Sequence, residues 1–139
     1  MELDIRMHDD YVATLADWVA MLSISTRLMF EKVRERAIKE ITARLDKVEA
    51  FELIRLAIKF DVEQWLKPAY RLIVTRAELI TRAESVKIPA HVAIILTRSR
   101  EQYWKGFTYN QHHGALTPDA IIEAEIRLMA AEPVGAPDE

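Results

Sequence analysis

The sequence predicts an all-α protein of six or seven helices stacked in antiparallel pairs, and three observations support this class. The 139-residue chain has only three glycines. All of them follow Trp104, so the first hundred residues lack the turn signals typical of a β protein. Apolar residues recur with the period of an amphipathic helix along most of that length. Residues that cap helices separate the apolar stretches, which gives each expected helix a beginning.

The first two helices are amphipathic. One is expected from Asp10 to Leu28, with Asp9 or Asp10 as its cap, because apolar residues follow a helical period there. A second is expected from Phe30 to Arg44, where seven charged residues between positions 31 and 40 flank one apolar stripe.

The third helix is expected from Lys47 to Phe60, with Asp46 as its cap. Its polar residues form a single narrow stripe, and every other face is apolar. This helix is therefore predicted to be the most buried one. The centre of the core is predicted to consist of Leu53, Ile54, Ala57 and Ile58.

A proline stands inside the next helical pattern, which runs from Asp61 to Arg76. Asp61 and Gln64 have the spacing of a capping box, which predicts that a new helix begins there. Pro68 lacks an amide hydrogen and clashes with the preceding turn when it lies in a helix interior. The sequence therefore predicts a kink near residues 64–67.

The C-terminal third is predicted to contain three helices. Thr81 and Glu84 form a capping box for a short helix that ends near Lys87. Pro89 begins a helix that runs to about Trp104, and residues 106–116 are expected to form a loop. Thr117-Pro118 begins a last helix that ends near Ala131. One helical domain is thus expected over residues 1–131, followed by a disordered acidic tail, 132–139.

Composition narrows the classes of function. A net charge of −3 argues against nucleic acid as a general partner, and no stretch is apolar enough to span a membrane. Cysteine is absent and no signal peptide is seen, which favours an intracellular location, cytoplasmic or nuclear. Charge is uneven, since residues 67–105 hold eight basic and three acidic residues. That excess fits either solvated helix faces or a basic face for an acidic partner.

Four segments carry a resemblance to a known family. They are "WVAMLSISTRLMFEKVRERAIKEI" and "LDKVEAFELIRLAIKFDVEQWLKPAYRLIVTR", followed by "LITRAESVKI" and "RSRE". Residues 18–104 resemble the helical region that follows the BTB/POZ domain in basidiomycete fungal proteins, and more distantly the BACK region. Lys87-Ile88 stands where that family has a glycine, and no BTB domain is expected in the short segment before Trp18. The resemblance implies a BACK-like helical fold without a catalytic motif.

No catalytic, cofactor-binding or metal-binding residues are predicted. The histidines are His8, His91 and the adjacent pair His112-His113, a spacing that does not bring three or four ligands together for zinc. No phosphate-binding glycine loop and no nucleophile elbow is present. The sequence therefore predicts no enzyme, no cofactor and no small-molecule substrate.

An aromatic stretch near the end of the expected long helix is the candidate partner-binding site. It consists of Tyr103, Trp104, Phe107 and Tyr109, which form either a small core at the helix end or an exposed binding patch. We expect a protein-interaction or scaffold module whose partner is a protein, a second copy of the chain included. One alternative is a substrate adaptor for a ubiquitin ligase or a transcription complex. Another is a small helical enzyme or ligand carrier.

Overall fold

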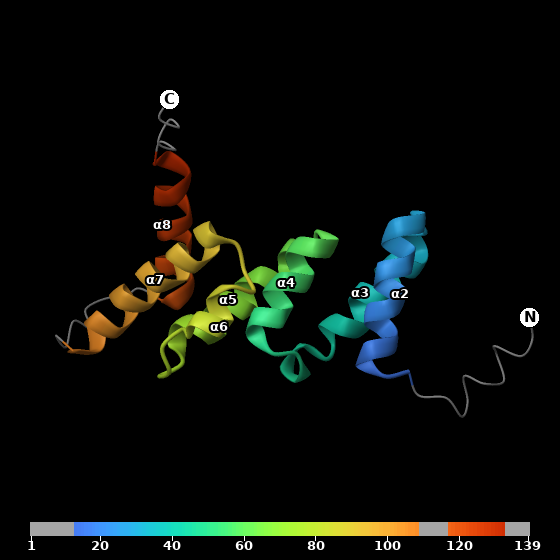
Figure 1. The fold of residues 1–139 in the computed structure, drawn as a ribbon, viewed down its shortest axis with the longest axis horizontal. Coiled ribbons are helices and arrows are strands. Elements are labelled where there is room, and N and C mark those ends of the chain that lie inside the picture. The colour runs from blue at the N-terminus through green and yellow to red at the C-terminus, as the bar shows by residue number, and fades with distance from the viewer. Residues whose placement is uncertain (1–12, 109–116, 133–139) are drawn as a thin grey trace, which may run out of the picture. The chain divides into compact units, whose positions relative to one another are not determined.

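The computed structural model describes residues 13–108 and 117–132, and within these ranges the chain is all α-helical, without a β-strand (Figure 1). The predicted all-α class is therefore confirmed, and the contacts between helices show the predicted stacking of antiparallel pairs in part. The chain divides into two compact units, Met1–Val48 and Glu49–Glu139. The single domain expected over residues 1–131 stays a prediction, because two compact units can fold as one domain or as two.

The first unit contains a helical hairpin. Its helices are α2 (Leu15–Leu28) and α3 (Glu31–Thr42), which pack against each other and are joined by Met29 and Phe30. A short 3₁₀-helix, η1 (Leu45–Lys47), follows them.

A capping box begins α2, at a different place from the one predicted. The side chain of Thr14 accepts a hydrogen bond from the Asp17 amide, and the Asp17 carboxylate accepts one from the Thr14 amide. The described helix therefore begins at Leu15 rather than at Asp10, and the predicted caps Asp9 and Asp10 lie outside the described residues.

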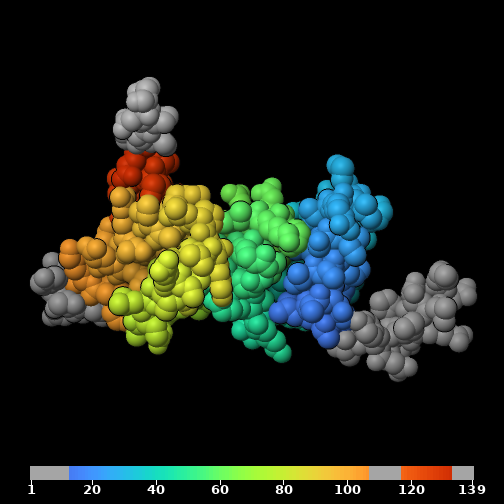
Figure 2. Space-filling model, viewed as in Figure 1, coloured from blue at the N-terminus to red at the C-terminus, as the bar shows by residue number. Residues whose placement is uncertain are grey.

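The second unit contains α4 (Ala50–Phe60), the 3₁₀-helix η2 (Glu63–Trp65), α5 (Leu66–Thr75), α6 (Arg82–Ser85), α7 (Ala90–Thr108) and α8 (Pro118–Ala131). Helix α5 contacts α4, α7 and α8, and α8 crosses α7 (Figure 1). The space-filling view shows α4 to α7 packed without a gap between them (Figure 2). The core of the second unit contains fully buried side chains from α4, α5, α7, α8 and η2, among them Phe51, Ile54, Trp65, Ile73, Leu96 and Ile122.

The predicted centre of this core is right for Leu53, Ile54 and Ala57 and wrong for Ile58. The first three are buried, whereas Ile58 is 45% exposed. Helix α4 is apolar on several faces, and its neighbours cover only some of them. An apolar pattern in the sequence does not tell which faces are covered.

Helix α4 also begins later than predicted. Its first residue is Ala50, and the Glu49 carboxylate accepts a hydrogen bond from the Phe51 amide. Asp46, the predicted cap, lies in η1 instead. The local chain first forms a tight 3₁₀ turn, and the extended conformation of Glu49 then opens the α-helix.

The predicted capping box of Asp61 and Gln64 is wrong. Asp61 has φ 58° and ends α4 in the left-handed conformation, which aspartate tolerates better than most residues. Its amide donates to the Ala57 carbonyl. Gln64 lies in η2. The residue that was expected to begin a helix therefore ends the preceding one.

The position of Pro68 also differs from the prediction. Helix α5 begins at Leu66, so Pro68 is its third residue. The first amides of an α-helix have no acceptor within the helix, and a proline there removes no hydrogen bond. No continuous helix runs from Asp61 to Arg76, because the chain changes from η2 to α5 before the proline.

Two of the last three predicted helix beginnings are confirmed, and the third differs by one residue, because α7 begins at Ala90 rather than at Pro89. Thr81 and Glu84 form a capping box for α6, and Thr117 caps α8 with Pro118 as its first residue. Helix α8 ends at Ala131 as predicted. Helix α7 is longer than predicted, because Gly106 to Thr108 continue it. The rest of the expected loop, 109–116, and residues 133–139 of the expected tail lie outside the described residues.

A matched pair of isoleucines in α4 tests where the core lies. Ile54 is fully buried, so Ile54→Ala should lower the free energy of unfolding by about 2–5 kcal/mol. Ile58→Ala removes the same atoms from a half-exposed site and should cost less than about 1 kcal/mol. Urea denaturation of both variants measures the difference, and equal losses would contradict this packing.

A proline in the first turn of a helix predicts a small effect of its removal. Pro68→Ala restores an amide that has no acceptor in the helix and gives the unfolded chain more freedom. The free energy of unfolding should change by less than about 1 kcal/mol. A larger loss in urea denaturation would show that the proline ring itself is required for packing.

Candidate functional site

The C-terminal end of α5 is held by two side chains of α7. Arg100 Nη1 donates hydrogen bonds to the carbonyls of Ile73 and Arg76, at 2.6 and 2.7 Å, and its Nη2 donates to the Ala77 carbonyl at 3.3 Å. Trp104 lies one helical turn later, and its Nε1 donates to the Val74 carbonyl at 3.1 Å. The last carbonyls of an α-helix lack partners within the helix, so these donors satisfy them.

Charge adds to this interaction. The guanidinium of Arg100 lies at the negative end of the α5 dipole, where a cation is favoured. Arg100 is only 6% exposed. Burial, and next the repulsion from Arg76, lower the pKa of Arg100 from its ordinary value. Within the described part of the chain, no carboxylate forms an ion pair with Arg100.

The segment between α5 and α6 is fixed by Arg76. Its guanidinium forms two hydrogen bonds with the Glu84 carboxylate, at 3.0 and 2.5 Å, and also donates to the carbonyls of Glu78 and Leu79. Glu84 in turn accepts a hydrogen bond from the Thr81 amide. One arginine thus connects the end of α5, the connecting segment and the capping box of α6.

These bonds stabilise the charged form of Glu84. The hydrogen bonds from Arg76 and then from the Thr81 backbone lower the pKa of Glu84 from 4.5 to about 2. Both side chains of the pair are about one quarter exposed, so solvent screens part of the attraction.

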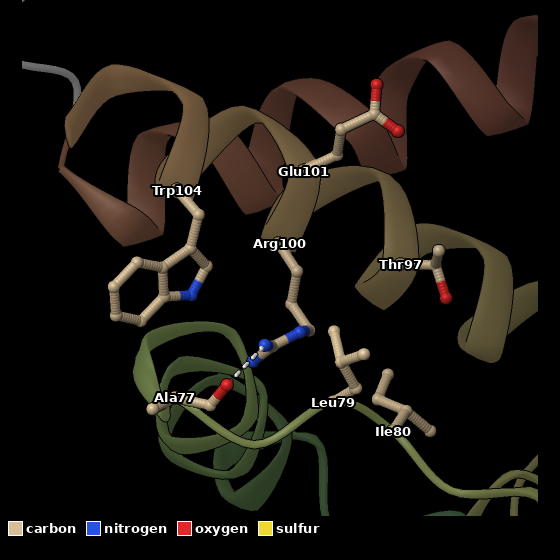
Figure 3. Close-up of a pocket in the computed structure, with 7 residues that line it drawn as sticks. All are labelled: Ala77, Leu79, Ile80, Thr97, Arg100, Glu101 and Trp104. Atoms are coloured by element: carbon tan, nitrogen blue, oxygen red, sulfur yellow. Dashed lines mark hydrogen bonds between the residues drawn. The ribbon is translucent and has the colours of Figure 1, made fainter. Parts of the chain in front are cut away.

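A pocket lies between α7 and the segment that follows α5 (Figure 3). Its volume is about 530 Å³. We call it the α5–α7 groove and define it by its lining residues, which are Ala77, Leu79, Ile80, Thr97, Arg100, Glu101 and Trp104. Figure 3 shows the Arg100 guanidinium between Trp104 and Leu79, while the Glu101 carboxylate points away from them. Leu79 is 77% exposed.

The structure places the predicted partner-binding residues on or beyond α7. Tyr103 and Trp104 are half-buried and form an edge-to-face pair with ring centroids 5.5 Å apart. Trp104 lines the α5–α7 groove, and Tyr103 does not. The backbone of Phe107 continues α7, but its side chain and the whole of Tyr109 lie outside the described residues. A shared binding patch of the four rings stays a prediction.

Of the seven groove residues, only Trp104 was among the predicted site residues. Three of the six others carry the argument below, and they are Leu79, Ile80 and Arg100. Leu79 and Ile80 stand between the end of one helix and the capping threonine of the next, where polar residues are more usual. Two large apolar residues at such a place are the signal that could have pointed to them. Nothing in the sequence around Arg100 points to this site, because the carbonyls that it binds belong to the end of α5.

The basic excess of residues 67–105 is partly matched by α8. Lys67 and Arg71 of α5 pair with Glu123 and Asp119 of α8, at 2.6 and 2.8 Å. Arg98 of α7 pairs with Glu132 at 3.0 Å. Some of the cationic side chains in this region therefore form ion pairs with acidic residues of the same chain. Those side chains are not left as a basic face for an acidic partner.

Residues 13–108 and 117–132 contain no group of three histidine, cysteine, aspartate or glutamate side chains that could hold a metal ion. His91 is exposed, and the other three histidines lie outside these ranges. No helix within the same ranges is long and apolar enough to cross a membrane. Comparison with family models, with curated proteins and with solved structures finds no match for the chain.

The Arg76–Glu84 pair predicts a pH dependence of stability. Because the pKa of Glu84 is about 2 in the folded chain, against 4.5 for an unperturbed glutamate, its contribution is present above pH 4.5 and is lost as pH falls toward 2. Glu84→Gln should therefore be less stable than the unmodified chain at pH 6, and the difference should shrink at pH 2.5. Urea denaturation at both pH values measures it, with the exposed Glu63→Gln as control. A difference that stays constant would contradict the pairing.

Proposed function

We propose that the chain is a non-catalytic protein-interaction module that binds a segment of a partner protein in the α5–α7 groove. The observation that carries the proposal is Leu79, a large apolar side chain that is 77% exposed at the edge of a groove. Exposed apolar surface beside a concavity is typical of a binding site.

The groove is fixed before a partner arrives. The backbone of Leu79 is held by a hydrogen bond from Arg76 to its carbonyl at 3.1 Å. On the other side of the groove, Arg100 and Trp104 are held by the carbonyls at the end of α5. A binding surface that is already ordered loses little conformational entropy on association.

The residue types also suit this role. Tryptophan and arginine are the side chains most enriched among residues that dominate binding energy at protein interfaces, and the groove contains one of each. The resemblance of residues 18–104 to the helical region after the BTB/POZ domain of basidiomycete fungal proteins agrees with an interaction role. An adaptor for a ubiquitin ligase or a transcription complex would be a specific form of it.

A ligand carrier is the second candidate, and the volume of about 530 Å³ favours it, because small-molecule sites have volumes of about 300–1,000 Å³. Such sites bury most of the ligand surface. The exposure of Leu79 instead favours a partner large enough to cover the edge of the groove.

A displayed library of random peptides tests the proposal. Selection on the folded chain should enrich a set of peptides. These peptides should bind the Leu79→Ser variant at least about tenfold more weakly than the parent chain, because that variant removes the exposed apolar edge. Leu128→Ser is the matched control, since Leu128 is 56% exposed on α8 and does not line the groove. The selected peptides should bind Leu128→Ser as tightly as they bind the parent chain.

Both leucines are exposed, so both variants should keep the circular dichroism spectrum and the stability of the parent chain. Failure to enrich any peptide, or equal losses for the two variants, would contradict the proposed function.

A further inference from the structure

The cation in the α5–α7 groove has unused hydrogen-bond donors. A guanidinium has five N–H groups. In Arg100 two on Nη1 and one on Nη2 donate to backbone carbonyls. The Nε hydrogen and the second Nη2 hydrogen have no acceptor in the described part of the chain. Arg100 therefore lines the groove with two N–H groups that have no acceptor in the described part of the chain.

Two carboxylates in this part of the fold are engaged with other cations. Glu84 accepts two hydrogen bonds from Arg76, and Glu101 pairs with Lys105 at 3.7 Å. Glu101 lines the groove, but Figure 3 shows its carboxylate pointing away from Arg100. Among the described residues, the positive charge of Arg100 is opposed by the carbonyl dipoles at the end of α5 and by the charge of Glu78, which forms no ion pair with Arg100.

Around this cation the lining is apolar. Leu79, Ile80 and the Trp104 ring offer contacts for an aliphatic or aromatic side chain. A ligand carboxylate that reached Arg100 would form charge-assisted hydrogen bonds, which are about twice as strong as neutral ones. Because Arg100 as a whole is 6% exposed, water would compete weakly for those bonds.

We infer that the α5–α7 groove selects partner segments in which an aspartate or glutamate side chain stands next to a large apolar side chain. The carboxylate binds Arg100, and the apolar neighbour packs between Leu79 and Trp104. This inference rests on the proposed function, since it specifies which protein segment the groove accepts.

The test changes the ligand rather than Arg100, because loss of Arg100 would also remove three hydrogen bonds at the end of α5. The probe is a displayed library of nine-residue peptides whose central residue is glutamate, glutamine or lysine in equal amounts, with random residues elsewhere. Selection on the unmodified chain should enrich central glutamate at least about tenfold over glutamine, and lysine should be depleted.

A spectroscopic readout locates the carboxylate. In nitrogen-edited NMR spectra, the Arg100 Nε–H signal should shift when the best glutamate peptide is added. The same peptide with glutamine in place of the central glutamate should shift it much less. The indole N–H signal of Trp104 should respond to the apolar neighbour of either peptide.

The outcomes separate this inference from the proposed function. Equal enrichment of glutamate and glutamine, with binding still lost in Leu79→Ser, would overturn the carboxylate inference and leave the interaction module standing. Absence of any Leu79-dependent peptide would overturn both. Concentration-dependent dimers in sedimentation velocity that disappear in Leu79→Ser would assign the groove to a second copy of the chain and overturn the inference.

Discussion

The capping of α5 by Arg100 and Trp104 is the interaction on which the second unit depends most. Without it, the last carbonyls of α5 would be buried beneath α7 with too few partners, at a cost of about 1–3 kcal/mol each. The same contact fixes where α5 ends and therefore the direction in which the chain leaves it. Arg76 then reaches Glu84, and Leu79 is held at the edge of the groove. A structural contact between two helices thus also positions the surface that we propose as the binding site.

Much of the fold could be predicted because local patterns decide it. The capping box of Thr81 and Glu84 and the start of α8 at Pro118 need only neighbouring residues, and both were predicted correctly. The errors arise where one residue type has two uses. Asp61 suits both a helix beginning and a left-handed helix end, and the backbone conformation alone separates them. Ile58 belongs to an apolar face, but the sequence does not reveal whether another helix covers that face.

The candidate site was less predictable, because it is made of tertiary contacts. Trp104 was found from its aromatic neighbours, yet its described role depends on the Val74 carbonyl, thirty residues earlier in the chain. Arg100 and Leu79 meet only because α7 folds back onto the end of α5. The basic excess of residues 67–105 was visible in the sequence. The sequence did not show that Lys67 and Arg71 face α8, since this follows from helix packing.

The ion pairs between α5 and α8 have a consequence for the alignment of these helices. Lys67 and Arg71 are one turn apart, and so are their partners Glu123 and Asp119. The next residue on that face of α8 is Arg127. If α8 slid by one turn toward its N-terminus, Arg71 would still meet Glu123, but Lys67 would meet Arg127 and be repelled. A slide in the opposite direction would separate Arg71 from Asp119 and leave it without its partner. These exposed charges therefore favour one register of α8 along α5. The apolar contacts of Ile121 and Ile122 are non-directional and do not select a register alone.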